Sequence, residues 1–315
     1  MATARGSNAK LYLKRQTAPE TLATGNFIQA PFLSLSLSGS QALGQDNLLG
    51  AGIGRDGGDP YLDTLTVDGN AVVPVDTTLF GYWLDMLLGA PTTTGTTDKT
   101  HTFLSGKTAL PDYSIEKALP DVPAYDMFLG VKATSLSIGL DPSGPANATI
   151  GLLALNETRA TTSGAGTPTL PAYQRFMRPS GTISRDGTPL GKVVGGSLNF
   201  SNGMSGIRTV RSDSRIDEID VGQSSASGDL RVRFNDTSLI TAAVASTPVA
   251  LAYGFSISAT KSISFEFPRV FLSRPRVEIA GPAGIDLPIA WTAAFSPADG
   301  ALLRVVLKNQ VASYA

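Results

Sequence analysis

Two stretches of the chain carry the same pattern of polar and apolar positions. They are Asp76–Leu84 and Asp236–Val244, which lie 160 positions apart (236 − 76 = 160). Each opens with Asp-Thr, whose side-chain oxygens can accept hydrogen bonds from the free N–H groups at a helix start. Each continues with apolar residues at helical spacing, namely Leu79, Phe80, Trp83 and Leu84, and then Leu239, Ile240, Ala243 and Val244. This pattern predicts two short capped helices, each with an apolar stripe against a sheet. We expect Trp83 and Leu84 to be buried and Asp85 to be exposed.

The same offset matches residues upstream of the two helices. Arg55 corresponds to Arg215, and Val72 corresponds to Val232. Because 160 is about half of 315 residues, and domains of about 150 residues are typical, we expect one domain built twice. The expected division is a first domain with an N-terminal arm at 1–158, a linker at 159–171 and a second domain at 172–315.

Outside the helices the pattern is that of strands and turns. Residues 64–67 and 71–75 predict a β-hairpin around Asp68-Gly69, since Asp-Gly suits a tight reversal. Each half also contains a long polar segment in the same place, 39–63 and 201–228. A segment of that length in a compact domain usually has a function or is disordered, and its recurrence favours a function. We therefore expect a mainly β protein, with two tandem β-sandwich or barrel domains that each carry one short helix.

Composition supports this class and limits the partners. The chain has 33 glycines and 20 prolines, and its net charge is −1 with 16% charged residues. That balance excludes a strongly basic protein that grips nucleic-acid phosphates. The absence of cysteine excludes disulfides and thiolate metal sites. No apolar run approaches the roughly 20 residues that span a bilayer, and residues 1–17 do not resemble a signal peptide. We expect a protein assembled inside a cell, without a membrane.

Four candidate chemical motifs are weak. Gly52–Gly57 matches G-x-G-x-x-G, but Gly58-Asp59-Pro60 follows where a dinucleotide site needs a helix. Residues 105–108, Ser-Gly-Lys-Thr, resemble the end of a P-loop that lacks its first glycine. His101 is the single histidine and has no second imidazole or nucleophile elbow beside it. Asp56, Asp59 and Asp63 leave a calcium site open, although their spacing differs from known calcium loops. We assign no catalytic, cofactor-binding or metal residue and expect no enzyme.

The chain resembles the two-domain major tail tube proteins of long, flexible-tailed bacteriophages (siphophages). The resemblance covers nearly the whole chain and rests on segments in both halves, none of which is a reactive motif. These segments are Gly69–Asp76, Leu88–Pro91, His101–Phe103, Leu110–Glu116, Val122–Tyr125, Gly130–Ala133, Arg215–Asp217, Phe234–Asp236 and Arg274–Ile279.

The resemblance implies subunits that close into rings, and rings that stack into a hollow tube in the virion tail, assembled in the host bacterial cytoplasm. A duplicated domain implies three chains per ring, which form a pseudo-hexamer. The implied partners are the chain itself, the tail terminator, tape measure and distal tail proteins, and phage DNA that passes through the lumen without sequence-specific binding.

In this interpretation the two long segments supply contacts between subunits or between rings. The residues expected there are Gly50, Gly52, Arg55, Asp59, Arg208, Arg211, Arg215, Asp217 and Glu218. Arg208, Arg211 and Arg215 stand beside several carboxylates, so we expect paired charges. Two alternatives stay open: the inner tube of a contractile injection machine, and a β-sandwich binding module of a virion fibre.

Overall fold

The computed structural model describes residues 3–46, 55–279, 281–282 and 284–314, and these residues form a mainly β protein with two short α-helices. The strands of the first half are β1 (Lys10–Arg15), β2 (Ile28–Gln29), β3 (Ser34–Leu35), β4 (Ser38–Gly44), β5 (Tyr61–Pro74), β6 (Thr92–Thr94), β7 (Lys99–Leu104), β8 (Tyr113–Leu119), β9 (Ala124–Gly139), β10 (Asn147–Ala154) and β11 (Asn156–Ala160). The strands of the second half are β12 (Gly181–Arg185), β13 (Thr188–Pro189), β14 (Val193–Ser201), β15 (Ser205–Ile207), β16 (Glu218–Asp220), β17 (Ser225–Arg233), β18 (Val249–Ser258), β19 (Lys261–Leu272), β20 (Asp286–Ala293) and β21 (Arg304–Asn309). The α-helices are α1 (Phe80–Leu88) and α2 (Ser238–Val244), and single 3-10 turns lie at Gly6–Asn8 and Arg178–Ser180. The expected mainly β class is confirmed.

The same order of neighbouring strands occurs in both halves. In the first half it runs β1, β8, β9, β10, β5 and β4, and in the second half it runs β12, β18, β19, β20, β17 and β14. All of these pairs are antiparallel. A further strand pairs with the start of the long central strand in each half, β11 with β9 and β21 with β19. Each helix follows the corresponding strand, α1 after β5 and α2 after β17.

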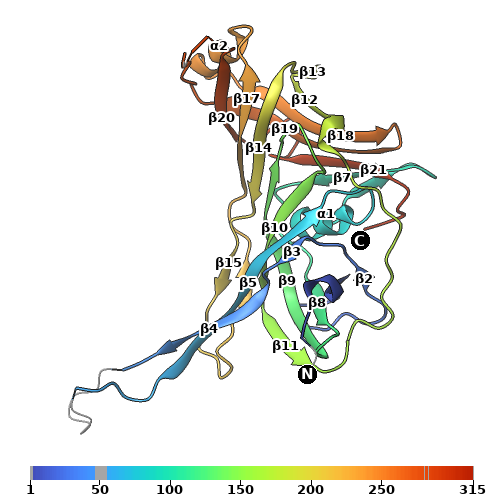
Figure 1. Ribbon diagram of the computed structural model, residues 1–315, viewed down its shortest axis with the longest axis vertical. Coiled ribbons are helices and arrows are strands. Elements are labelled where there is room, and N and C mark those ends of the chain that lie inside the picture. The colour runs from blue at the N-terminus through green and yellow to red at the C-terminus, as the bar shows by residue number, and fades with distance from the viewer. Residues whose placement is uncertain (1–2, 47–54, 280, 283, 315) are drawn as a thin grey trace.

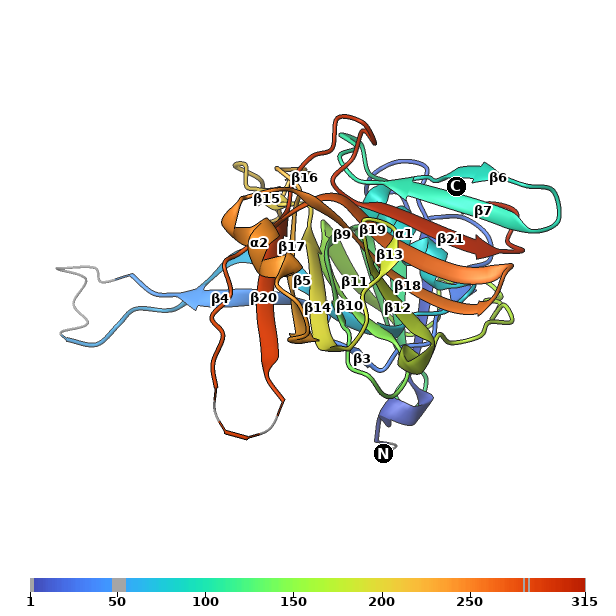
Figure 2. The same ribbon diagram turned by 90° about the horizontal axis from the view of Figure 1, so that it is seen from above.

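The two halves join through strand pairing rather than through a free linker (Figures 1 and 2). Residues Ser197–Ser201 of β14 pair with Ser135–Gly139 of β9. The hairpin of β6 and β7, which has no counterpart among the described strands of the second half, pairs through β7 with β21. One sheet therefore runs through both halves.

Both helix starts are held by the aspartates that the sequence pattern singles out. Asp76 Oδ1 accepts hydrogen bonds from the backbone N–H groups of Thr78 at 2.7 Å and Leu79 at 2.6 Å. Asp236 Oδ1 accepts the corresponding bond from Ser238 at 2.8 Å. Trp83 and Leu84 are 2% and 1% exposed, so their predicted burial is confirmed.

The expected exposure of Asp85 is wrong, because α1 is not a surface helix with one polar side. It lies against β9 and β7 of its own half, and Phe80 meets Phe265 of β19 in the other half, at 6.3 Å between ring centroids. Asp85 is fully buried and accepts a hydrogen bond from Tyr113 Oη at 2.5 Å. Arg15 Nη1 lies 3.4 Å from the same carboxylate, so the buried charge has a partner.

The predicted hairpin around Asp68-Gly69 is also wrong. Residues 61–74 form one strand, β5, which pairs with β10 without interruption from Val67 to Pro74. Gly69 has φ 152°, and a Cβ there would lie 2.6 Å from the backbone of Ser36. The glycine permits a close approach of β5 to the neighbouring chain segment, and the chain does not reverse.

The N-terminal region and the expected linker are both packed on the first half. Instead of a polar arm, Lys10–Arg15 form β1, which pairs with β8 along its whole length. Within 159–171, Ala165 is fully buried, and its carbonyl accepts a hydrogen bond from Phe27 N at 3.0 Å. The segment 159–171 thus packs against the first half.

Candidate functional site

Two long insertions stand between corresponding strands of the two halves. Residues 45–60 join β4 to β5, and residues 202–224 join β14 to β17. We call residues 41–65 the arm and residues 202–224 the charged segment. The arm projects from the body of the molecule in both views (Figures 1 and 2), whereas the charged segment folds back onto the first half.

The described part of the arm exposes large apolar side chains. Leu43, Tyr61 and Leu62 are 68%, 51% and 62% exposed. Across the arm, Gln41 Nε2 donates to the Asp63 carbonyl and Gln45 Nε2 donates to the Gly58 carbonyl, each at 2.5 Å. An exposed apolar group of this kind on a projecting hairpin is typical of a surface that contacts another protein.

Two of the four contact residues expected in the arm lie in the described part of the chain. Arg55 and Asp59 are exposed, and Gly50 and Gly52 lie outside the described residues. In the part of the chain that the structure describes, no three acidic or histidine side chains gather in a way that could hold a metal ion. Asp56, Asp59 and Asp63 are therefore not gathered into such a group.

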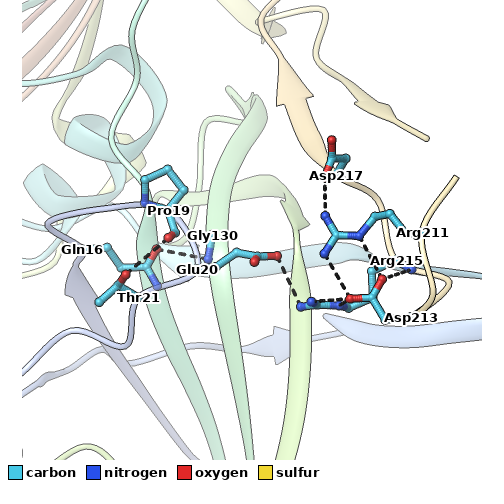
Figure 3. A network of polar contacts seen from close by, with 9 residues as sticks. All are labelled: Gln16, Pro19, Glu20, Thr21, Gly130, Arg211, Asp213, Arg215 and Asp217. Carbon is cyan, nitrogen blue, oxygen red and sulfur yellow. Dashed lines mark hydrogen bonds and ion pairs between the residues drawn. The ribbon is translucent and has the colours of Figure 1, made fainter. Parts of the chain in front are cut away.

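The charged segment carries a network of paired charges (Figure 3). Arg211 donates to Asp213 at 2.9 and 3.0 Å and also contacts Asp217. Arg215 donates to the same Asp213 carboxylate at 2.6 and 2.9 Å. Hydrogen bonds from Arg211 and Arg215 lower the pKa of Asp213, and hydrogen bonds to Asp213 and Asp217 raise the pKa of Arg211. The expected pairing is thus present for Arg211, Arg215 and Asp217.

The remaining two predicted residues are not part of this network. Arg208 and Glu218 are exposed, and neither forms an ion pair within the described residues. Arg208 borders a hollow of about 200 Å³ between the charged segment and the base of the arm, where Leu62 and Asp63 also lie. The structure therefore brings Arg208 close to the arm, although their positions are far apart in the sequence.

Contacts that the sequence did not indicate hold the charged segment on the first half. Arg215 Nη1 lies 3.3 Å from Glu20 Oε1, and Leu65 N donates to the Ser214 carbonyl at 2.8 Å. Ile216 and Ile219, 3% and 8% exposed, pack with Leu155, the residue that directly follows β10. Ile216 and Ile219 are three positions apart in a polar stretch, a signal too short to predict a docked segment.

His101 and Lys107 have structural roles, and Gly52–Gly54 of the G-x-G-x-x-G match lie outside the described residues. His101 is fully buried, and its two ring nitrogens lie 2.8 Å from Thr93 Oγ1 and 3.1 Å from Asn309 Oδ1. Lys107 of the P-loop-like stretch donates to the Ala90 carbonyl instead of facing a phosphate cradle. None of the helices in the described residues has the length and apolar character needed to cross a bilayer.

The family model for phage tail tube proteins matches residues 6–293. The chain belongs to the phage tail tube protein family. A search of curated proteins finds no match. As a tail tube protein, the chain is a structural, self-assembling component of the virion tail.

Proposed function

We propose that three copies of this chain close into a ring, and that such rings stack into the tail tube of a long, flexible-tailed phage. The repeated strand order carries this proposal. A chain made of two similar halves, divided near 1–158 and 172–315, supplies two of six pseudo-equivalent positions. Three chains then complete a ring through one type of heterologous contact that closes on itself.

Free strand edges support a ring of this kind. Among the described strands, β4 pairs only with β5, whereas its counterpart β14 pairs with both β17 and β9. An unpaired edge invites pairing with another chain. In a closed ring, that second chain is the neighbouring subunit, so the edge is used rather than left open to aggregation.

The charge of the chain supports a conduit for DNA. The net charge is −1, and several arginines, among them Arg159, Arg211 and Arg215, are paired with carboxylates, which reduces the number of cations that can neutralise phosphates. Phosphate contacts release counterions and create affinity, which would hinder the passage of DNA. We propose that DNA moves through the lumen without sequence-specific binding. The tail terminator, tape measure and distal tail proteins are the proposed partners at the tube ends and inside the tube. The proposal assigns no catalytic step to the protein.

Negative-stain microscopy and native mass spectrometry of the purified protein test the proposal. The expected result is hollow rings or tubes whose smallest closed unit contains three chains. Rings of six chains would contradict the proposed stoichiometry, and monomers at high concentration would contradict the tube role. Tubes found with a contractile sheath protein would favour the alternative of a contractile machine.

A further inference from the structure

The contact between the two halves has a defined pattern inside one chain. β14 of the second half pairs with the end of β9, and the charged segment that follows β14 then crosses to the end of β10. There Ile216 and Ile219 cover Leu155. An opposite-charge pair, Arg215 with Glu20, accompanies the apolar contact.

The corresponding place on the second half is uncovered. β18 pairs with one edge of β19 as far as Val270. Beyond Val270 no described strand pairs with that edge, whereas β14 pairs with the corresponding edge at the end of β9. Phe295 lies two residues beyond β20 and is 56% exposed. A phenylalanine shortly after β20 thus remains exposed, whereas Leu155 directly after β10 is covered.

The arm is the corresponding insertion of the first half, and of its described residues Leu43, Tyr61 and Leu62 are exposed, although Leu65 at its base bonds the charged segment. It follows β4 as the charged segment follows β14, and its exposed Leu43, Tyr61 and Leu62 match Phe295 in apolar character. Within one molecule the arm points away from the body (Figure 1). The described arm and the surface around Phe295 therefore both present large exposed apolar side chains.

Charge complementarity points to the same pairing. Residues 55–63 of the arm contain three aspartates and one arginine, a net charge of −2 (1 − 3 = −2). Residues 269–276, at the end of β19, contain three arginines and no acidic residue. Arg269 lies beside Phe295 and donates to its carbonyl at 3.5 Å. Opposite potentials on two surfaces favour and orient their association.

We propose that the arm of one copy lies on the end of β19 and β20 in the second half of the next copy. In this contact Leu43, Tyr61 and Leu62 cover Phe295, and the free edge of β4 pairs with β19 beyond Val270. The contact repeats between chains what β14 and the charged segment do within one chain. It rests on the proposed ring and names the surfaces that close it.

Cross-linking tests this contact, because the natural chain has no cysteine. A double variant, Leu62→Cys with Phe295→Cys, is oxidised after assembly and run on a non-reducing gel. The expected result is a covalent series that ends at the trimer and returns to the monomer on reduction. The control pair is Leu62→Cys with Ile257→Cys. Ile257 is also an exposed apolar residue, but it lies toward the opposite end of the β18–β19 hairpin.

Microscopy of the same samples separates this contact from the ring itself. Normal rings without the Leu62–Phe295 cross-link would overturn the contact and leave the ring intact. A series that continues beyond the trimer would place the arm between rings and also overturn it, as would equal cross-linking of the control pair. Absence of any oligomer, in the natural protein as well, would overturn both proposals.

A charge substitution gives a second test. Phe295→Asp is expected to keep the melting temperature, since the side chain is largely exposed, and to abolish ring formation. Ile257→Asp is the matched control and is expected to form rings normally. Normal assembly of folded Phe295→Asp would contradict the proposed contact.

Discussion

At the scale of single residues, buried carboxylates decide how α1 is held. Asp76 is 1% exposed and Asp85 is fully buried, yet both lie in or beside the same short helix. Burial raises the pKa of Asp76 to about 6, against the opposing effect of the hydrogen bonds from Thr78 and Leu79. Burial also raises the pKa of Asp85, and its partners are Tyr113 and Arg15. Each buried charge is tolerated because it has hydrogen-bond donors.

The raised pKa of Asp76 predicts a pH dependence of stability. An unfolded aspartate titrates near pH 3.9, so the native state binds this proton more tightly, and its contribution to stability falls as pH rises from about 4 to about 6. Asp76→Asn keeps an acceptor for the helix N–H groups and removes the titration. Relative to the natural protein, this variant should gain on the order of 2–3 kcal/mol in unfolding free energy between pH 4 and pH 7.

Asp236 is the matched control, because it caps α2 on the surface. Hydrogen bonds from Ser238 lower its pKa, so its contribution is present at neutral pH and is lost as pH falls through the native pKa. Asp236→Asn should therefore change the pH dependence in the opposite direction. Urea unfolding at several pH values measures both variants, and equal responses would contradict the assigned burial of Asp76.

Trp83 is expected to anchor α1 in the core. It is 2% exposed, and Trp83→Ala should lower the unfolding free energy by about 3–5 kcal/mol, as large-to-small substitutions in cores do. Val244→Ala in α2 is the control, because Val244 is 57% exposed and should change stability by less than about 0.5 kcal/mol. A loss under about 1 kcal/mol for Trp83→Ala would place its side chain outside the core.

At the scale of elements, α1 and α2 share a local sequence pattern but differ in how far they are buried. α1 lies between β9 of its own half and β19 of the other half, and eight of its nine residues are buried. α2 packs on β19 and buries only Leu239 and Ala242. The arm and the charged segment differ in a similar way, since Ile216 and Ile219 of the charged segment are buried against Leu155, whereas Leu43, Tyr61 and Leu62 of the arm are exposed. Each pair of elements thus has one member that is more buried within the chain than the other.

Deleting residues 50–58 tests the role of the arm. The deletion leaves β4 and β5 complete, so the protein should fold with an unchanged melting temperature. It removes residues of the connection between Leu43 and Leu62, so polymerisation should fail. Negative-stain microscopy and circular dichroism measure these two outcomes. Tubes of normal length from the shortened chain would show that the arm is dispensable for assembly.

At the scale of the whole molecule, 25 basic and 26 acidic residues nearly cancel. Several cations are held by carboxylates, among them Arg159 and Lys117 on Asp126, and Arg304 on Glu266. Asp126 is fully buried, whereas Arg304 and Glu266 are both partly exposed, and a pair of that second kind adds little to stability. Their effect on a tube is that the paired cations are less available to phosphates.

The wall of the assembled lumen is accordingly expected to be neutral to acidic. A DNA duplex that crosses the tube meets like charge or no charge, and it is not retained. An electrostatic map computed on a cryo-EM structure of the assembled tube measures this. A continuous basic stripe along the channel would contradict the expectation and indicate a protein that grips DNA.

The sequence by itself determined the features that depend on neighbouring residues. The capping aspartates, the two short helices, the mainly β class and the paired charges of residues 211–217 follow from local hydrogen bonding and periodicity. The resemblance in segments of both halves indicates the tail tube family from the sequence alone.

Only the tertiary structure decided which surfaces are covered. Asp85 is buried because Tyr113 and residues of the second half meet α1, and Asp68-Gly69 continues a strand because β10 lies alongside it. Leu155 is buried because Ile216 and Ile219 of the charged segment, which are distant in sequence, pack against it, whereas Phe295 remains exposed. Strand pairing and burial depend on contacts between residues far apart along the chain. Local propensity cannot predict which distant segment packs against a given strand or side chain.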